Sequence, residues 1–164
     1  MRHVISVLME NESGALSRVV GLFSARGYNI ESLSVAPTDD DSLSRLTLVT
    51  RGSEQIIEQI LKQLNKLIEI VKVSDLSDFK YIEREMMLIK VEAKHADAIT
   101  SIKQIADIFR GKIIDLSNKT FTIEVSGQGE KLDAFVEAMH DQIIIEVVRS
   151  GCIGIARGNN SLKA

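Results

Sequence analysis

The sequence predicts an α+β protein made of two units of the same kind, and the order of its apolar runs supports this. Runs of strand length alternate with stretches of helical periodicity, in the order strand, helix, strand, strand, helix, strand. The same order begins again in the second half of the chain. We therefore expect two split βαβ units in tandem, each an antiparallel four-stranded sheet with two helices on one face.

The ends of the two first helices also resemble each other. One ends in Phe23-Ser24-Ala25-Arg26-Gly27 and the other in Phe109-Arg110-Gly111. In both, glycine suits the left-handed residue that follows a helix. Together with the repeated order of elements, this similarity indicates an internal duplication with a period of roughly eighty residues.

The first unit opens on an apolar run and continues with a helix whose apolar residues lie at helical spacing. Ser13 or Asn11 is expected to cap this helix. The expected elements are, in order, a strand over 4–9, a helix ending at Arg26-Gly27, strands over 30–36 and 44–50, a helix opening at Gly52-Ser53, and a strand over 68–73.

The second unit follows a polar connector and repeats this order. Its expected elements are a strand over 86–91, a helix carrying Ile99, Ile102 and Phe109, strands over 113–116 and 120–125, a helix over 132–139, and a strand over 143–148. The domain boundaries are accordingly placed at 1–76, 77–83 for the connector, and 84–164 for the second domain with a short glycine-bearing tail.

The topology predicts an unprotected sheet edge in the first unit. In the usual strand order (fourth, first, third, second) the strand over 30–36 lies at an edge, with no lysine or bulge before Pro37. Such an edge favours aggregation unless another strand pairs with it. A symmetric dimer that joins two of these edges would protect it.

Composition excludes several classes of function. A net charge of -3 and a pI near 5.7 give no electrostatic footprint for nucleic acid. No apolar run has transmembrane length, and no separate basic and apolar regions mark a signal peptide. The single cysteine, Cys152, cannot form an internal disulfide, which is typical of the cytoplasm.

Catalytic and metal-binding patterns are weak. His3, His95 and His140 are widely separated, so each is expected at a surface or a strand end. Cys152 has no local pattern of a catalytic nucleophile, and a packed small residue is the favoured interpretation. The run 39–41 lacks the spacing of a calcium loop and is expected to be a solvated turn.

The turn between the first strand and the first helix is the best candidate site. The backbone N–H groups of Gly14 and Ala15 can bind a carboxylate at the start of the helix. The side chain or carbonyl of Asn11 can accept a bond from an ammonium group. These features suit a free amino acid, although the same residues also suit an ordinary tight turn between strand and helix.

The remaining parts of the candidate site come from elsewhere in the first unit. Asn29, contributed by a partner subunit, is a second acceptor for the ammonium group. Leu16 and Ile30 supply an apolar pocket of a size that suits valine rather than an aromatic side chain. The second unit has 93–97 at its first turn, with no Asn-x-x-Gly, so no equivalent site is expected there.

The chain resembles a known family, the regulatory (small) subunits of acetolactate synthase, also called acetohydroxyacid synthase. The resemblance covers nearly the whole chain, and its first two runs are the most specific. The runs that carry it are 11–18, 26–33 and 35–38 in the first half, and 84–85, 109–111 and 131–135 in the second.

The resemblance implies an N-terminal ACT domain followed by a second ferredoxin-like domain, in a homodimer. It implies a non-catalytic subunit that enhances a catalytic large subunit, which uses thiamine diphosphate, Mg²⁺ and FAD. It also implies feedback inhibition by valine at the interface between two ACT domains, in branched-chain amino-acid biosynthesis. Residues that match the family's effector site are Asn11, Gly14, Ala15, Asn29 and Ile30.

Two other functions remain open at this point. One is a free-standing ACT protein that senses an amino acid and regulates a different enzyme or transcription. The other is a small enzyme, which would need a convergent acid–base pair that the sequence does not contain.

Overall fold

The computed structural model describes residues 1–163, and packing divides them into two compact units. The first unit comprises residues 1–83 together with the tail that begins at Cys152. The second unit comprises 84–151. Among residues 1–163, no helix has the length and apolar content needed to span a membrane.

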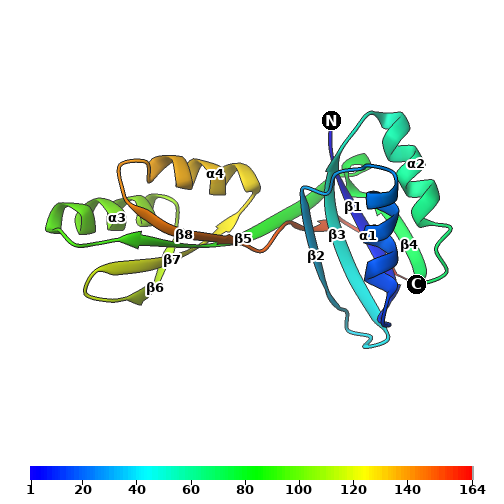
Figure 1. Cartoon of the computed structure of the whole chain (residues 1–164), viewed down its shortest axis with the longest axis horizontal. Coiled ribbons are helices and arrows are strands. Elements are labelled where there is room, and N and C mark those ends of the chain that lie inside the picture. Colours follow the sequence, from blue (N-terminus) through cyan, green and yellow to red (C-terminus); the bar gives the residue numbers. More distant parts are fainter. Residues whose placement is uncertain (164) are drawn as a thin grey trace. The chain divides into compact units, whose positions relative to one another are not determined.

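The first unit is a four-stranded antiparallel sheet with α1 and α2 on one face (Figure 1). Its strand order is β2-β3-β1-β4, which confirms the predicted order and the edge position of β2. Its elements are β1 (Arg2–Glu10), α1 (Ala15–Ala25), β2 (Ser32–Pro37), β3 (Leu43–Arg51), α2 (Glu54–Leu64) and β4 (Ile70–Asp75).

The core of the first unit lies between the sheet and its two helices. Alternate residues of β1, Ile5 and Val7, face the helices, and Val19 and Phe23 of α1 meet them. Phe23 is 1% exposed and packs edge-on against Tyr28, with ring centroids 6.1 Å apart. Burying each such side chain stabilises the fold by about 1.5–3 kcal/mol. The helical spacing of the apolar residues therefore determines which face of α1 packs on the sheet.

The opposite face of this sheet is partly covered by the tail. Here η1 (Leu76–Asp78) and β9 (Ile153–Ala156) meet a small cluster containing Val4, Leu76 and Cys152. The backbone N–H of Cys152 donates to Ser32 Oγ at 2.9 Å. A Cβ on Gly154 would lie 2.6 Å from Leu76 Cδ1, so glycine permits this close approach.

The domain boundaries predicted from the sequence therefore differ from the packing in one segment. The sequence places the tail after residue 151 with the second domain, whereas its packing places it with the first. The physical reason is that Cys152 and the glycine at 154 fit the apolar outer face of the first sheet, a contact between residues far apart in sequence.

The second unit repeats the topology of the first, as predicted. Its four strands have the order β6-β7-β5-β8, and α3 and α4 cover one face (Figure 1). The short strand β9, which was not predicted, also pairs with β5. Its elements are β5 (Tyr81–Glu92, entering from the first unit), α3 (Ala96–Ile108), β6 (Lys112–Leu116), β7 (Thr120–Gly127), α4 (Gly129–Ala138) and β8 (Ile144–Arg149).

The two helix-ending glycines prove to have different roles. Gly27 has φ +69°, as expected for the left-handed residue after α1. After α3 the left-handed residue is Arg110, with φ +56°, so the prediction for Gly111 is wrong. A Cβ on Gly111 would lie 3.1 Å from both Ile123 and Val125, so this glycine permits close packing of the chain on β7.

Candidate functional site

The turn between β1 and α1 is tied to the hairpin turn that joins β2 and β3. The backbone N–H of Asn11 donates to the carbonyl of Ser42 at 2.7 Å. The side-chain Nδ2 of Asn11 donates to the carbonyl of Asp41 at 2.9 Å. This orientation of the amide leaves Oδ1 as the atom of Asn11 that can accept a bond. The anchoring carbonyls were not predicted, because backbone groups carry no mark in a sequence.

Gly14 occupies the N-cap position of α1 in a left-handed conformation, with φ +93° and ψ -15°. Its carbonyl accepts from the N–H of Arg18 at 3.0 Å, which starts the helix. A Cβ at Gly14 would meet no atom within 4 Å, so the space beside it is open. The glycine is thus required by its backbone angle, and it leaves room for a ligand beside the helix start.

No side chain caps α1, so the prediction that Ser13 or Asn11 caps this helix is wrong. The amide of Asn11 is instead directed to the hairpin turn. The N–H of Ala15 makes only a long bond of 3.3 Å to the carbonyl of Glu12, and the first turn of α1 carries no acidic side chain. The helix start therefore keeps donors and a partial positive charge that suit an anion.

The other predicted residues divide into two groups. Ala15 is 2% exposed, and Leu16 is half-buried against the core, so both border the open turn from the helix side. Asn29 and Ile30 follow the far end of α1. Asn29 is exposed and its carbonyl accepts from Thr50 Oγ1 at 2.6 Å, while Ile30 is half-buried against the core.

A single chain does not bring these two groups together. The helix between them has 11 residues, which corresponds to about 16 Å at 1.5 Å per residue. β2, which begins two residues after Ile30, pairs with β3 on one side, and Val35 near its middle is 39% exposed. The arrangement places one part of the predicted site at each end of an edge strand.

Comparison with known proteins shows the same architecture in one family. A model of the small subunit of acetolactate synthase matches residues 84–158, and a model of the AHAS small subunit-like ACT domain matches residues 5–72. The acetolactate synthase small subunit of Haemophilus influenzae is 53% identical over 163 residues, which covers 99% of both chains. The chain belongs to the family of acetolactate synthase small subunits.

Two further relatives agree with this assignment. The acetolactate synthase isozyme 3 small subunit of Escherichia coli is 51% identical over 164 residues, covering 99% of this chain and 100% of the relative. The crystal structure of the acetolactate synthase small subunit of Thermotoga maritima superimposes with a TM-score of 0.88 at 38% identity, covering 98% and 99% of the two chains. The first unit is thus an ACT domain, and the whole chain has the fold of this small subunit.

Two other side chains with reactive groups, Cys152 and His3, make contacts that stabilise the fold. Cys152 is 5% exposed, and burial raises the pKa of its thiol to about 11, which confirms the interpretation as a packed residue. His3 Nδ1 lies 2.7 Å from Asp75 Oδ2 in a mostly buried pair at the beginning of β1. Its burial was not predicted, because the partner is 72 residues away.

The acidic run of the hairpin turn forms a local hydrogen-bonded turn. The carboxylate of Asp40 accepts from the N–H of Ser42 at 2.9 Å and from its hydroxyl at 2.6 Å. These bonds lower the pKa of Asp40, and the residue is exposed, as expected for a solvated turn. Among residues 1–163, no three His, Cys, Asp or Glu side chains are grouped to hold a metal ion.

Proposed function

We propose that this small subunit regulates the catalytic large subunit of acetolactate synthase, and that valine bound between two ACT domains inhibits the enzyme. The observation that carries the proposal is the open, uncapped start of α1 at Gly14. It presents backbone donors beside open space, as recognition of a free carboxylate requires. The pathway is that of the branched-chain amino acids, in the cytoplasm.

The proposal includes a homodimer formed through β2. Antiparallel pairing of two β2 edges about a two-fold axis sets the beginning of one strand beside the end of the other. The end of β2 leads into the hairpin turn that holds Asn11. The pairing therefore brings Asn29 and Ile30 of the partner subunit toward the Gly14 turn, and each dimer has two equivalent sites.

In each site the ligand's three parts have separate contacts. Its carboxylate binds the N–H groups of Gly14 and Ala15. Its ammonium group donates to Oδ1 of Asn11 and to Asn29 of the partner subunit. Its side chain lies against Leu16 and against Ile30 of the partner subunit. A single methylene changes such a fit by about 1–3 kcal/mol, so preference among valine, leucine and isoleucine depends on fine packing.

The chain acts without a catalytic centre of its own in this proposal. Thiamine diphosphate, Mg²⁺ and FAD belong to the large subunit, and this chain changes how that subunit works. Valine inhibits if it binds one arrangement of the dimer more tightly than another, and a coupling of about 1–3 kcal/mol is sufficient.

Calorimetric titration of valine into the purified full chain tests the site. Gly14→Asp places a carboxylate where the ligand's carboxylate docks, so we expect heat of binding to vanish. Gly21→Asp is the matched control, since Gly21 lies on the same helix with nothing within 4 Å of its added Cβ. Valine affinity equal to wild type in Gly14→Asp refutes the site.

Reconstitution with a large subunit tests the wider function. We expect the wild-type chain to raise acetolactate formation and to make it sensitive to valine. The Gly14→Asp chain should raise activity without conferring that sensitivity. Failure of the chain to bind any thiamine-dependent large subunit would favour a free-standing amino-acid sensor instead.

A further inference from the structure

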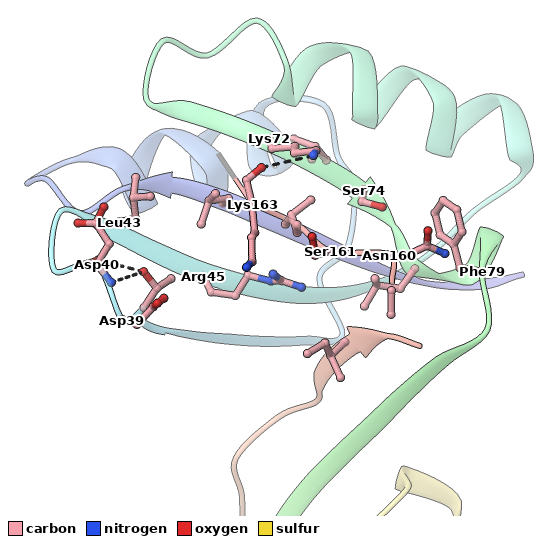
Figure 2. Close-up of a pocket in the computed structure, with 17 residues that line it drawn as sticks. Asp39, Asp40, Leu43, Arg45, Lys72, Ser74, Phe79, Asn160, Ser161 and Lys163 are labelled. Carbon is pink, nitrogen blue, oxygen red and sulfur yellow. Dashed lines mark hydrogen bonds between the residues drawn. The ribbon is translucent and has the colours of Figure 1, made fainter. Parts of the chain in front are cut away.

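The face of the first sheet that lies away from α1 and α2 contains a cavity, which the residues of the Gly14 turn do not line. Its volume is about 630 Å³, within the range of small-molecule sites. Figure 2 shows Arg45 and Lys72 directed into it from two strands, with the tail residues Asn160, Ser161 and Lys163 lying over it. All of its lining residues belong to the first unit.

The strand register explains why two cations meet there. Leu8 of β1 pairs with Arg45 on one side and with Lys72 on the other. Cross-strand partners share a face, so all three lie on the outer face, opposite Val7 and the helices. With strands spaced about 4.8 Å apart, the two cationic residues start about 10 Å apart, within reach of a single anionic group.

Arg45 carries a buried polar atom that has no partner in this cavity. Its Nε is buried and has no hydrogen-bond partner among residues 1–163. One terminal nitrogen makes only a long bond of 3.4 Å, to the carbonyl of Gly154. Burial lowers its pKa, but a guanidinium remains charged at any physiological pH. An anion that accepts from Nε would offset this cost.

The charges around Arg45 leave this position open for an outside anion. Lys72 Nζ donates to the backbone carbonyl of Lys163 at 3.3 Å, a neutral acceptor. Asp39 and Asp40 line the cavity on the hairpin turn, and both are exposed. The carboxylate of Asp40 is already bonded to Ser42, and no salt bridge joins Arg45 to an acidic residue within 1–163.

The rest of the cavity wall is mostly apolar. Phe79 is 45% exposed and Ile155 is 61% exposed, although both lie at a hollow where a ligand could cover them. Leu43 and Leu76 line the same space. A simple inorganic anion would leave these side chains in water, whereas a carboxylate with an apolar body would cover them.

We propose that this cavity binds a small carboxylate with an apolar body. Arg45 and Lys72 hold the carboxylate, the apolar wall receives the body, and residues 160–163 of the tail close over it. The ligand needs no ammonium group, since the two acidic residues of the wall, Asp39 and Asp40, are exposed, and the carboxylate of Asp40 is already bonded to Ser42. This site is separate from the proposed valine site, since none of Asn11, Gly14 and Ala15 lines the cavity. The hairpin turn that carries Asp39 and Asp40 also anchors Asn11, so the two sites share one structural element.

Titration of the full chain with 3-methylbutanoate, followed by NMR and calorimetry, tests the proposal. We expect saturable binding, with shifts at Leu8 and Ser74, that weakens by about tenfold or more in Arg45→Gln and in Lys72→Gln. Lys72 is exposed, so its variant is expected to fold and decides the outcome if Arg45→Gln does not. The matched control is Arg26→Gln, an exposed arginine beyond α1, which should bind as wild type does.

Two further measurements distinguish this cavity from the valine site and from a simple anion site. Gly14→Asp should leave 3-methylbutanoate binding unchanged, and loss of binding there would assign the ligand to the valine site and overturn the proposal. Inorganic phosphate should bind more weakly than 3-methylbutanoate. Equal or tighter binding of phosphate would overturn the proposed role of the apolar wall. Absence of saturable binding, or wild-type affinity in both cation variants, would overturn the site altogether.

Discussion

Replacing Gly14 by alanine tests the backbone of the proposed valine site. The added Cβ would meet no atom within 4 Å, so no steric clash contributes. The cost arises from φ +93°, a conformation that an L side chain disfavours by about 1–2 kcal/mol. Alanine also lowers the conformational entropy of the unfolded chain relative to glycine, which stabilises the folded state by about 0.4–1 kcal/mol. We therefore expect the free energy of unfolding of the first unit to fall by about 1 kcal/mol.

Urea unfolding followed by tyrosine fluorescence measures this change in the whole chain. The protein has two tyrosines and no tryptophan, and both Tyr28 and Tyr81 belong to the first unit. Their signal therefore reports on the unit that contains Gly14. Gly14→Asn is the matched control, because asparagine tolerates left-handed angles better than alanine and also suits an N-cap position.

The order of stabilities identifies the source of the cost. We expect wild type, then Gly14→Asn, then Gly14→Ala, with an unchanged dependence on urea concentration. An alanine variant as stable as wild type would show that the left-handed angle carries no cost. Equal loss in the alanine and asparagine variants would show that the cost has another source.

Three further predictions concern the edge, the tail and the buried thiol. Val35→Lys should make the protein monomeric in sedimentation and weaken valine binding. The control Val71→Lys, on β4, should leave the dimer and valine binding unchanged, and a dimeric Val35→Lys protein would refute pairing through β2. Gly154→Val should lower the free energy of unfolding by about 1–3 kcal/mol, because its Cβ would overlap Leu76; an unchanged urea midpoint would contradict this. Cys152 should react with a thiol reagent at pH 8 only after unfolding, and fast labelling of the native protein would contradict its burial. The neutral thiol should contribute fully to the free energy of unfolding below the pKa of the unfolded state, and this contribution should be lost as pH rises through the folded-state pKa of about 11.

Local pattern was sufficient to predict most of the fold. The apolar run of β1 and the helical spacing in α1 are properties of neighbouring residues, so they predict a buried strand and the buried face of the helix. The repeated order of elements then predicts the strand order, because a split βαβ unit has few ways to close its sheet. The edge position of β2 follows from the same topology.

Contacts between distant residues were less predictable. Ser13 or Asn11 was expected to cap α1, but the hairpin turn supplies a backbone carbonyl that accepts from the amide of Asn11 instead. The role of Gly111 depends on side chains of β7 that approach from outside its own turn. In both cases the local chemistry allowed two outcomes, and a neighbour that is remote in sequence selected one.

The candidate valine site shows the same division. Its residue types were identified in the chain alone, since Gly14 and Asn11 lie in one short turn. Three features emerged only from the folded chain. Asn29 is separated from these residues along α1, the tail after Cys152 docks on the first sheet, and Arg45 meets Lys72 in one cavity. The physical reason is that periodicity encodes which face of an element is apolar, whereas packing between elements determines which polar groups share a space.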